Sequence, residues 1–409
     1  MHTLLRSRLA HTCALSRSTF TRGLCTASSR DALLFTPGPL TTSASVKQAM
    51  LTDLGSRDKK MMTVIQEIRD GLLDLAGVSQ TSGYECVLVQ GSGTFAVESV
   101  VSSVVPPPAD GGKLLVVSNG AYGLRMAKMC EIHGIDHEVL EYSETQAPTP
   151  QEVEAAVRGG GFTHVGLIHH ETTAGTLNPV EAIGAALHAL DPSLTFIVDS
   201  MSGFGCYPLD LRKGHVDYLV SSANKNIEGV PGFAFAICRR DRLVAQGGHA
   251  RTLSLDLRAN WESLESGGQF RFTPPTHALL AFHRAMRELR DEGGVAGRQA
   301  RYQANAAALV AGMREMGFEP YLDADKQGCI ITTYLVPDDR HWDFERFYDE
   351  LAELGVVIYP GKLTKAECFR LGTIGRIFPH DVRAALLAIR DVLTRMGVAL
   401  PVTQKGEGA

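Results

Sequence analysis

The stretch that best indicates the fold is Asp217-Tyr-Leu-Val-Ser-Ser-Ala-Asn-Lys-Asn-Ile-Glu-Gly-Val-Pro-Gly-Phe-Ala-Phe-Ala-Ile237, in which one lysine lies between two apolar runs. Residues 218–220 and 233–237 are rich in β-branched and aromatic side chains and are bounded by Gly and Pro, which predicts two buried strands. Lys225 then lies at the end of a strand, where desolvation favours the neutral amine that can form a Schiff base. A solvated loop lysine is the alternative, so the interpretation depends on the other motifs.

The composition predicts a globular enzyme. At 409 residues, two domains are the default, and 44% hydrophobic with 21% charged residues is ordinary for such a protein. The net charge of -5 argues against a nucleic-acid partner. No run of eighteen apolar residues predicts a membrane span. The eight cysteines are scattered without zinc-ligand spacing, so neither a metal site nor a disulfide framework is expected.

The first 30 residues differ from the rest of the chain. They contain five arginines and many serine and threonine residues, and the first acidic residue is Asp31. This composition is typical of a transit peptide and predicts a mitochondrial matrix protein after cleavage. A basic tail without a targeting role is the alternative. Residues 31–40 follow as an extended arm, because Pro37 and Pro39 exclude a helix, and the arm is expected to cross the surface.

A glycine-rich turn follows the first strong strand pattern. Residues 85–101 predict a strand, a turn and a helix, so the unpaired amides of the first helical turn face whatever lies at the turn. Ser92, Gly93 and Thr94 would form a phosphate site there. The turn lacks the third glycine of a dinucleotide-binding motif and the Gly-Lys-Ser/Thr of a P-loop.

Polar residues recur at the carboxyl ends of the next predicted strands, where open α/β sheets bind ligands. Tyr122 could stack on a flat ring, Thr172 could offer a hydroxyl, and Asp199 needs a cationic partner such as a protonated ring nitrogen. The pair at positions 169 and 170 is rejected as a metal site, because adjacent strand residues point to opposite faces. A phosphate site, a stacking aromatic residue, a strand-end aspartate and a strand-end lysine are the parts that pyridoxal phosphate requires.

The C-terminal part is expected to form a second domain. Residues 239–268 are predicted to be irregular and polar, and Gly293-Gly294 suggests a hinge. The predicted organisation is a transit peptide at 1–30, a large cofactor-binding domain with its arm at 31–294, and a smaller α+β domain with a disordered tail at 295–409. Arg370, in a predicted strand, is suited to a bidentate grip on an anion, and Arg57 is a second candidate anion contact.

Residues 33–393 resemble the class V, fold type I aminotransferases, and most closely the branch that acts on 2-aminoethylphosphonate and pyruvate. The resemblance lies in seven stretches: 35–40 (Phe-Thr-Pro-Gly-Pro-Leu), 55–58 (Gly-Ser-Arg-Asp), 90–95 (Gln-Gly-Ser-Gly-Thr-Phe), 171–175 (Glu-Thr-Thr-Ala-Gly), 198–202 (Val-Asp-Ser-Met-Ser), 223–226 (Ala-Asn-Lys-Asn) and 270–276 (Phe-Arg-Phe-Thr-Pro-Pro-Thr). It implies an α/β fold with a mixed, mostly parallel seven-stranded sheet, a smaller C-terminal domain and a homodimer.

The resemblance also implies roles for single residues. Lys225 would carry the Schiff base, Asp199 would pair with the pyridine nitrogen, and Arg370, with Arg57, would bind the substrate anion. Cofactor contacts would come from Ser92, Gly93, Thr94, Tyr122, Thr172, Met201 and Asn224, and from Thr273 across the subunit interface. The implied reaction converts 2-aminoethylphosphonate and pyruvate into phosphonoacetaldehyde and alanine.

Three alternatives remain open at this point. An alanine:glyoxylate or serine:pyruvate aminotransferase would use the same parts with a carboxylate substrate. A cysteine desulfurase would need a mobile cysteine, for which Cys368 is the nearest candidate, although its pattern places it on a strand. A catalytically silent protein could keep the fold, but the presence of both Lys225 and Asp199 argues against it.

Overall fold

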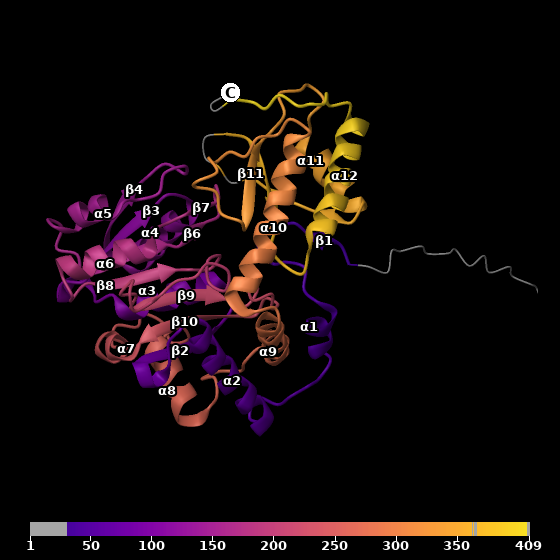
Figure 1. Cartoon of the computed structure of the whole chain (residues 1–409). Coiled ribbons are helices and arrows are strands. Elements are labelled where there is room, and N and C mark those ends of the chain that lie inside the picture. The colour runs from indigo at the N-terminus through magenta and orange to yellow at the C-terminus, as the bar shows by residue number, and fades with distance from the viewer. Residues whose placement is uncertain (1–30, 362, 364–365, 407–409) are drawn as a thin grey trace, which may run out of the picture. The chain divides into compact units, whose positions relative to one another are not determined.

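A mixed seven-stranded sheet lies at the centre of the fold in the computed structural model, which describes residues 31–361, 363 and 366–406 (Figure 1). The strand order is β2-β10-β9-β8-β5-β3-β4. The strands are β2 (Tyr84–Gln90), β3 (Lys113–Ser118), β4 (Asp136–Glu141), β5 (His164–Ile168), β8 (Thr195–Asp199), β9 (Tyr218–Ser222) and β10 (Phe233–Arg239). Only β10 runs antiparallel to its neighbours β2 and β9; the other pairs are parallel.

Helices flank this sheet, because most of its strands are apolar on both faces and buried throughout. They are α1 (Ala44–Ala49), α2 (Lys59–Leu75), α3 (Gly93–Val104), α4 (Ala121–His133), α5 (Pro150–Val157), α6 (Val180–Leu190), α7 (Arg240–Gln246), α8 (Leu257–Gly267) and α9 (Thr276–Asp291). Short 3-10 turns occupy η1 (Gln80–Ser82) and η2 (Pro108–Asp110). Because α3 and α4 directly follow β2 and β3, their first turns lie at the ends of those strands.

The C-terminal elements build a second hydrophobic core around a small sheet. They are α10 (Gly294–Arg314), β11 (Ile331–Leu335), α11 (Phe344–Glu353), β12 (Val356–Val357), β13 (Tyr359–Pro360), β14 (Cys368–Gly372) and α12 (Pro379–Met396). The strands of the small sheet are antiparallel, in the order β11-β14-β13. The ring of Phe369, on β14, packs against Phe318 and Phe347. Two further short strands, β6 (His170–Glu171) and β7 (Thr176–Leu177), form a hairpin.

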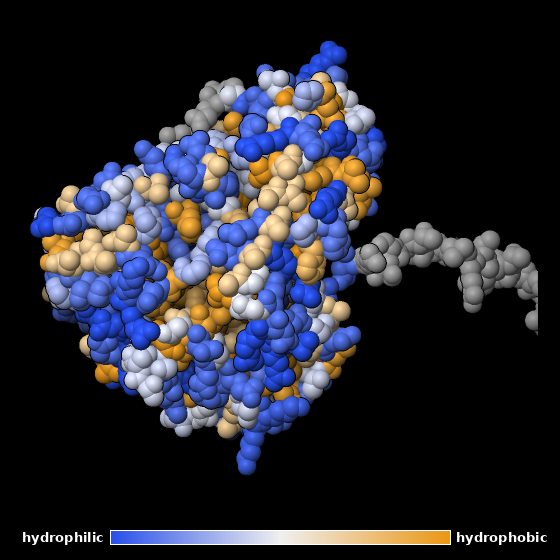
Figure 2. Space-filling model, in the orientation of Figure 1, coloured by the Kyte–Doolittle hydropathy of each residue, from blue (hydrophilic) through white to orange (hydrophobic). Residues whose placement is uncertain are grey.

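The α/β fold expected from the sequence is confirmed. The described residues from Ala32 onward form one compact unit, and we retain the division near Gly294 as a proposal. The transit-peptide prediction for residues 1–30 and the end of the predicted tail, residues 407–409, lie outside the described residues. Figure 2 shows a mainly hydrophilic face that is crossed by a pale strip of weakly hydrophobic residues along the alanine-rich α10.

The expectation that residues 239–268 are irregular is wrong, because they contain α7 and α8. The helix α8 buries only Leu257, Asn260 and Leu264, so its mostly polar sequence shows little helical periodicity. Asp256 starts α8 by accepting a hydrogen bond from the backbone N–H of Ala259 at 3.0 Å.

The N-terminal arm does not cross the surface. Phe35 is fully buried in the C-terminal core, and its carbonyl accepts from the backbone N–H of Gly372 at 2.9 Å. The preceding strand β1 (Leu33–Leu34) pairs in parallel with β12. Proline excluded a helix, as predicted, but the apolar side chains between the prolines and Asp31 take the arm into the core.

Candidate active site

Lys225 occupies the loop between β9 and β10, as the sequence predicts, and it contacts the N-terminal arm. Its Nζ donates to the carbonyl oxygens of Pro37 at 2.7 Å and Gly38 at 3.3 Å. Gly38 has φ of 106°, and a Cβ there would lie 2.6 Å from the carbonyl oxygen of Asn224. The arm can therefore approach the lysine this closely only through glycine. The loop is closed by a hydrogen bond from the N–H of Glu228 to the carbonyl of Lys225 at 2.7 Å.

Asp199 ends β8, next to β9, and is 7% exposed. Burial raises the pKa of Asp199 to about 6, an effect opposed by the N–H of Met201 and by the charges of Lys225 and Arg125. Oδ1 accepts from the Met201 N–H at 2.9 Å. A buried carboxylate of this kind is stabilised by a cation placed beside it.

The glycine-rich turn lies against the Asp199 segment. Ser92 is the N-cap of α3, and Gly93 is its first residue. A Cβ on Gly93 would collide with the Sδ atom of Met201, so the two residues pack directly together. The first turn of α3, with its unpaired N–H groups, therefore lies next to the residues that follow Asp199.

Arg125 adds positive charge near this turn, and sequence reasoning missed it. Its Nη1 donates to Thr94 Oγ1 at 3.3 Å, and its guanidinium lies 4.8 Å from the centre of the Tyr122 ring. Arg125 follows Tyr122 by three positions on α4, so the two side chains share one helix face. The spacing from Tyr122 is the signal that could have revealed it.

Glu171 was also given no role, although the sequence analysis quoted its motif. The residue is fully buried, and its carboxylate accepts from the backbone N–H of Tyr122 at 3.2 Å and from the hydroxyl of Thr173 at 2.6 Å. It thereby fixes the first turn of α4 to the segment that carries Thr172. Nothing in the local pattern distinguishes it, because its contact with α4 joins residues that are far apart in the sequence.

Arg370 lies on β14 and is 2% exposed. Its Nη1 donates to the carbonyl oxygen of Thr172 at 2.8 Å, its Nε donates to that of Pro360 at 3.0 Å, and the guanidinium lies 5.0 Å from the centre of the Tyr359 ring. Burial lowers the pKa of Arg370. Within residues 31–361, 363 and 366–406 no carboxylate oxygen comes within 4.0 Å of it, so a buried cation here lacks an anionic partner.

The contacts bring the predicted site residues together in small groups. Lys225 and Asn224 adjoin the arm, while Asp199 binds Met201, which packs on Gly93. Arg125 joins Thr94 to Tyr122, and Arg370 binds the carbonyl of Thr172.

Arg57 and Thr273 lie elsewhere on the chain. Both line a surface cavity of about 300 Å³ together with residues 269–272. The backbone carbonyl of Thr273 accepts a hydrogen bond from Gln90, which places this cavity beside the glycine-rich turn. Among the described residues of one chain, neither Arg57 nor Thr273 contacts Lys225.

A family model described as "Aminotransferase class-V" matches residues 42–362. The chain belongs to this family. Two relatives, both named 2-aminoethylphosphonate--pyruvate transaminase, come from Salmonella heidelberg and Salmonella typhimurium; each is 48% identical over 368 residues, which cover 89% of this chain and 98% of the relative. The solved ureidoglycine-glyoxylate aminotransferase of Bacillus subtilis superposes with a TM-score of 0.81 at 23% identity and covers 95% of this chain and 97% of that one.

These findings confirm the predicted family and fold of this class-V aminotransferase and correct its predicted location. The relatives match over nearly their whole length and are bacterial proteins, and bacteria have no mitochondria. The predictions of a mitochondrial location and a transit peptide are therefore wrong. An arginine-rich, acid-free composition is shared by import signals and by other basic segments, and composition alone does not separate them.

Two findings on this class-V aminotransferase concern its helices and its candidate metal ligands. Among the described helices, none has the length and apolar character needed to cross a membrane. His169 Nδ1 pairs with Ser200 Oγ at 2.8 Å, and no group of three or more metal-ligating side chains occurs in the described part of the chain.

Proposed function

We propose that this class-V aminotransferase transfers the amino group of 2-aminoethylphosphonate to pyruvate, giving phosphonoacetaldehyde and L-alanine, with pyridoxal phosphate as cofactor. The observation that carries the proposal is the buried Asp199 carboxylate. It accepts a hydrogen bond from Met201, which packs on Gly93 of the glycine-rich turn, and it lies next to the strand that leads to Lys225. The two Salmonella relatives bear the name of this reaction. Neither an alanine:glyoxylate nor a serine:pyruvate reaction is favoured by them.

The residues present fit pyridoxal phosphate. The amides of the first turn of α3, with Ser92 and Thr94, would hold the phosphate, and the Arg125 guanidinium beside Thr94 would add charge. Tyr122 would cover one face of the ring, Thr172 would bind the ring hydroxyl, and Met201 and Asn224 would line the site. When bound, the cofactor supplies an electron sink for the negative charge that develops at the substrate carbon.

The chain's own residues then have separate tasks. The Lys225 amine would hold the cofactor through its aldehyde, and Lys225 Nζ would move the proton of the substrate carbon. The buried Asp199 carboxylate would hold a proton on the ring nitrogen of the cofactor, because a buried anion stabilises a cation beside it. The Pro37 and Gly38 carbonyls, which accept from Lys225 Nζ, orient the amine.

The substrate anion would bind at Arg370. A phosphonate and a carboxylate both present paired oxygens to the planar guanidinium, so one arginine can serve both half-reactions. In the described residues Nη2 makes no hydrogen bond and can donate to a ligand. Arg57 is proposed as a second, outer anion contact.

We also propose a homodimer in which Thr273 reaches the cofactor phosphate of the other subunit. The support is a group of exposed apolar side chains around the glycine-rich turn: Phe95 (50% exposed), Leu253 (70%) and Phe272 (42%). Arg271 connects two of these segments by donating to the carbonyl of Leu253 at 2.7 Å. Burial of such side chains favours association of two chains.

The amino donor is tested with single half-reactions. Purified, cofactor-loaded enzyme is mixed separately with 2-aminoethylphosphonate, serine and alanine, and conversion of the bound cofactor to its amine form is followed by absorbance. We expect 2-aminoethylphosphonate to react at least about 100-fold more efficiently than serine, because a site with a buried, otherwise unpaired cation favours the more highly charged donor. Equal or better reaction with serine would contradict the proposed donor.

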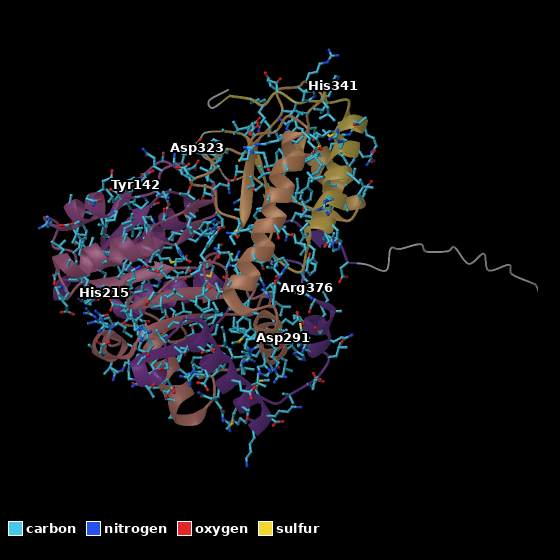
Figure 3. All side chains as sticks on the ribbon, in the orientation of Figure 1. Tyr142, His215, Asp291, Asp323, His341 and Arg376 are labelled. Carbon is cyan, nitrogen blue, oxygen red and sulfur yellow. The ribbon has the colours of Figure 1, made fainter. Side chains whose placement is uncertain are left out.

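Arg370→Lys tests the anion site. The change keeps a positive charge but removes the planar fork, and we expect the efficiency of both half-reactions to fall by about 30- to 1000-fold. The measurement is the efficiency with 2-aminoethylphosphonate and with pyruvate, beside the melting temperature. Arg376→Lys is the matched control, since the Arg376 guanidinium lies 5.2 Å from the centre of the Phe378 ring and Arg376 has no proposed role in the site; Figure 3 labels it. Full activity of Arg370→Lys toward both substrates would exclude this role.

A further inference from the structure

Two thiols that are far apart in the sequence face each other in the interior. Cys206 Sγ and Cys329 Sγ lie 3.8 Å apart. Cys206 belongs to the segment that follows Asp199, and Cys329 precedes β11. Among the described cysteines this is the one sulfur-to-sulfur contact, and a shift of about 2 Å would bring the atoms to bonding distance.

The two thiols differ in access. Cys206 is fully buried, whereas Cys329 lines a cavity of about 450 Å³ beside α10, together with Tyr207 and Ala306. The opposite wall comes from the loop around Asp323, which Figure 3 labels, and the pale strip in Figure 2 follows the same helix. A small oxidant in this cavity meets Cys329 first.

The two thiols also differ in acidity. Hydrogen bonds from the side chains of Cys206 and Tyr207 hold the pKa of the Cys329 thiol below its ordinary value, although burial acts in the opposite direction. The contact with Cys329 and burial raise the pKa of Cys206. Because the thiolate is the nucleophile, Cys329 is the residue that reacts, and Cys206 is the neighbour that keeps its proton.

We propose that Cys206 and Cys329 are a modification site that forms a reversible disulfide with hydrogen peroxide as the oxidant. The Cys329 sulfur attacks one peroxide oxygen, the O–O bond breaks, and a sulfenic acid and a first water form. The Cys206 sulfur then attacks the Cys329 sulfur, and the sulfenic oxygen leaves as a second water with the Cys206 proton. The two thiols lose two electrons, which the peroxide accepts.

The bridge would join two segments on either side of the candidate active site. On one side, Asn226, which follows Lys225, donates to the carbonyl oxygens of Ser202 at 2.9 Å and Phe204 at 3.0 Å. On the other, Thr373, three residues after Arg370, donates to the carbonyl of Cys329 at 2.6 Å. A cross-link that closes so long a loop should raise the melting temperature by about 3–8 °C.

The experiment treats the cofactor-loaded enzyme with a small excess of hydrogen peroxide. We expect the intact mass to fall by about 2 Da, a non-reduced digest to contain a Cys206–Cys329 cross-linked peptide, and dithiothreitol to reverse both changes and the rise in melting temperature. Cys130→Ser, which removes a buried thiol elsewhere, should behave like the wild type. The proposal does not depend on the aminotransferase reaction, because all of these readouts concern the chain itself.

Two variants make the result decisive. In Cys206→Ser the reaction should stop at the sulfenic acid, which dimedone would label at Cys329, and in Cys329→Ser neither the bridge nor the label at Cys206 should form. Absence of the cross-linked peptide from oxidised wild type would overturn the proposal, as would a 2 Da loss that persists in Cys206→Ser. Should either serine variant fail to fold, the corresponding alanine variant supplies the same test.

Discussion

Replacing Lys225 by alanine should abolish turnover while leaving the fold intact. The side chain is partly exposed and contacts the arm through two hydrogen bonds, so its loss leaves no large cavity. In the proposed function, however, the amine both holds the cofactor through its aldehyde and moves the substrate proton. Loss of a positioned proton-transfer group alone costs about 10²–10⁴-fold, and with loss of the covalent attachment we expect kcat to fall by at least about 10⁴-fold.

The control and the second readout separate chemistry from stability. Lys213→Ala removes a lysine that is 72% exposed and paired with Glu181, and it should leave kcat unchanged. Borohydride reduction followed by peptide mapping should place the cofactor on Lys225 in the wild type and on no peptide in Lys225→Ala. Turnover by Lys225→Ala within tenfold of the wild type, or a labelled lysine at another position, would refute the assignment.

The central sheet and the strand-end residues were predictable because their signals are local. Short runs of β-branched residues bounded by glycine indicate buried strands, and the polar residue that follows such a run lies at the sheet's ligand-binding edge. Tyr122, Asp199 and Lys225 were all found in this way. The helix α8 was not, since a single buried stripe in a polar segment leaves too weak a periodicity.

The residues that were missed act through distant partners. Glu171 binds the backbone of α4, and Arg125 reaches across to Thr94 on α3. Such contacts arise only when the strands are assembled in their final order. No local pattern indicates Glu171, and for Arg125 the spacing from Tyr122 is the one local signal. The buried arm shows the same limit, because its position depends on pairing with β12, more than 300 residues later in the chain.

Asp199→Asn should separate catalysis from stability. Asparagine can still accept the Met201 N–H hydrogen bond, but it carries no charge to hold a proton on the cofactor ring nitrogen. We expect kcat to fall by about 10²–10⁴-fold with the cofactor still bound. The measurement is the half-reaction rate together with the cofactor content. A rate within threefold of the wild type would rule out the electronic role.

The same substitution should stabilise the cofactor-free protein, and the effect should depend on pH. The pKa of Asp199 is raised from 3.8 to about 6 by burial, so its contribution to stability is full below pH 3.8 and is lost as the pH rises through about 6. Ionisation of Asp199 therefore lowers the free energy of unfolding of the wild type by about 3 kcal/mol at pH 8 and by about half of that at pH 5. Asparagine does not titrate, so its advantage in the free energy of urea unfolding should be about 1–2 kcal/mol larger at pH 8 than at pH 5.

Adding pyridoxal phosphate at pH 8 should make the wild type more stable than Asp199→Asn. In the proposed function, a protonated ring nitrogen would lie beside the Asp199 carboxylate in place of the water that burial removed, and it would offset the cost of the buried charge in the wild type only. The cofactor should therefore raise the melting temperature of the wild type by more than that of Asp199→Asn. An equal rise in both proteins would mean that the ring nitrogen and this carboxylate do not interact, and the cost of burying Asp199 would then need another explanation.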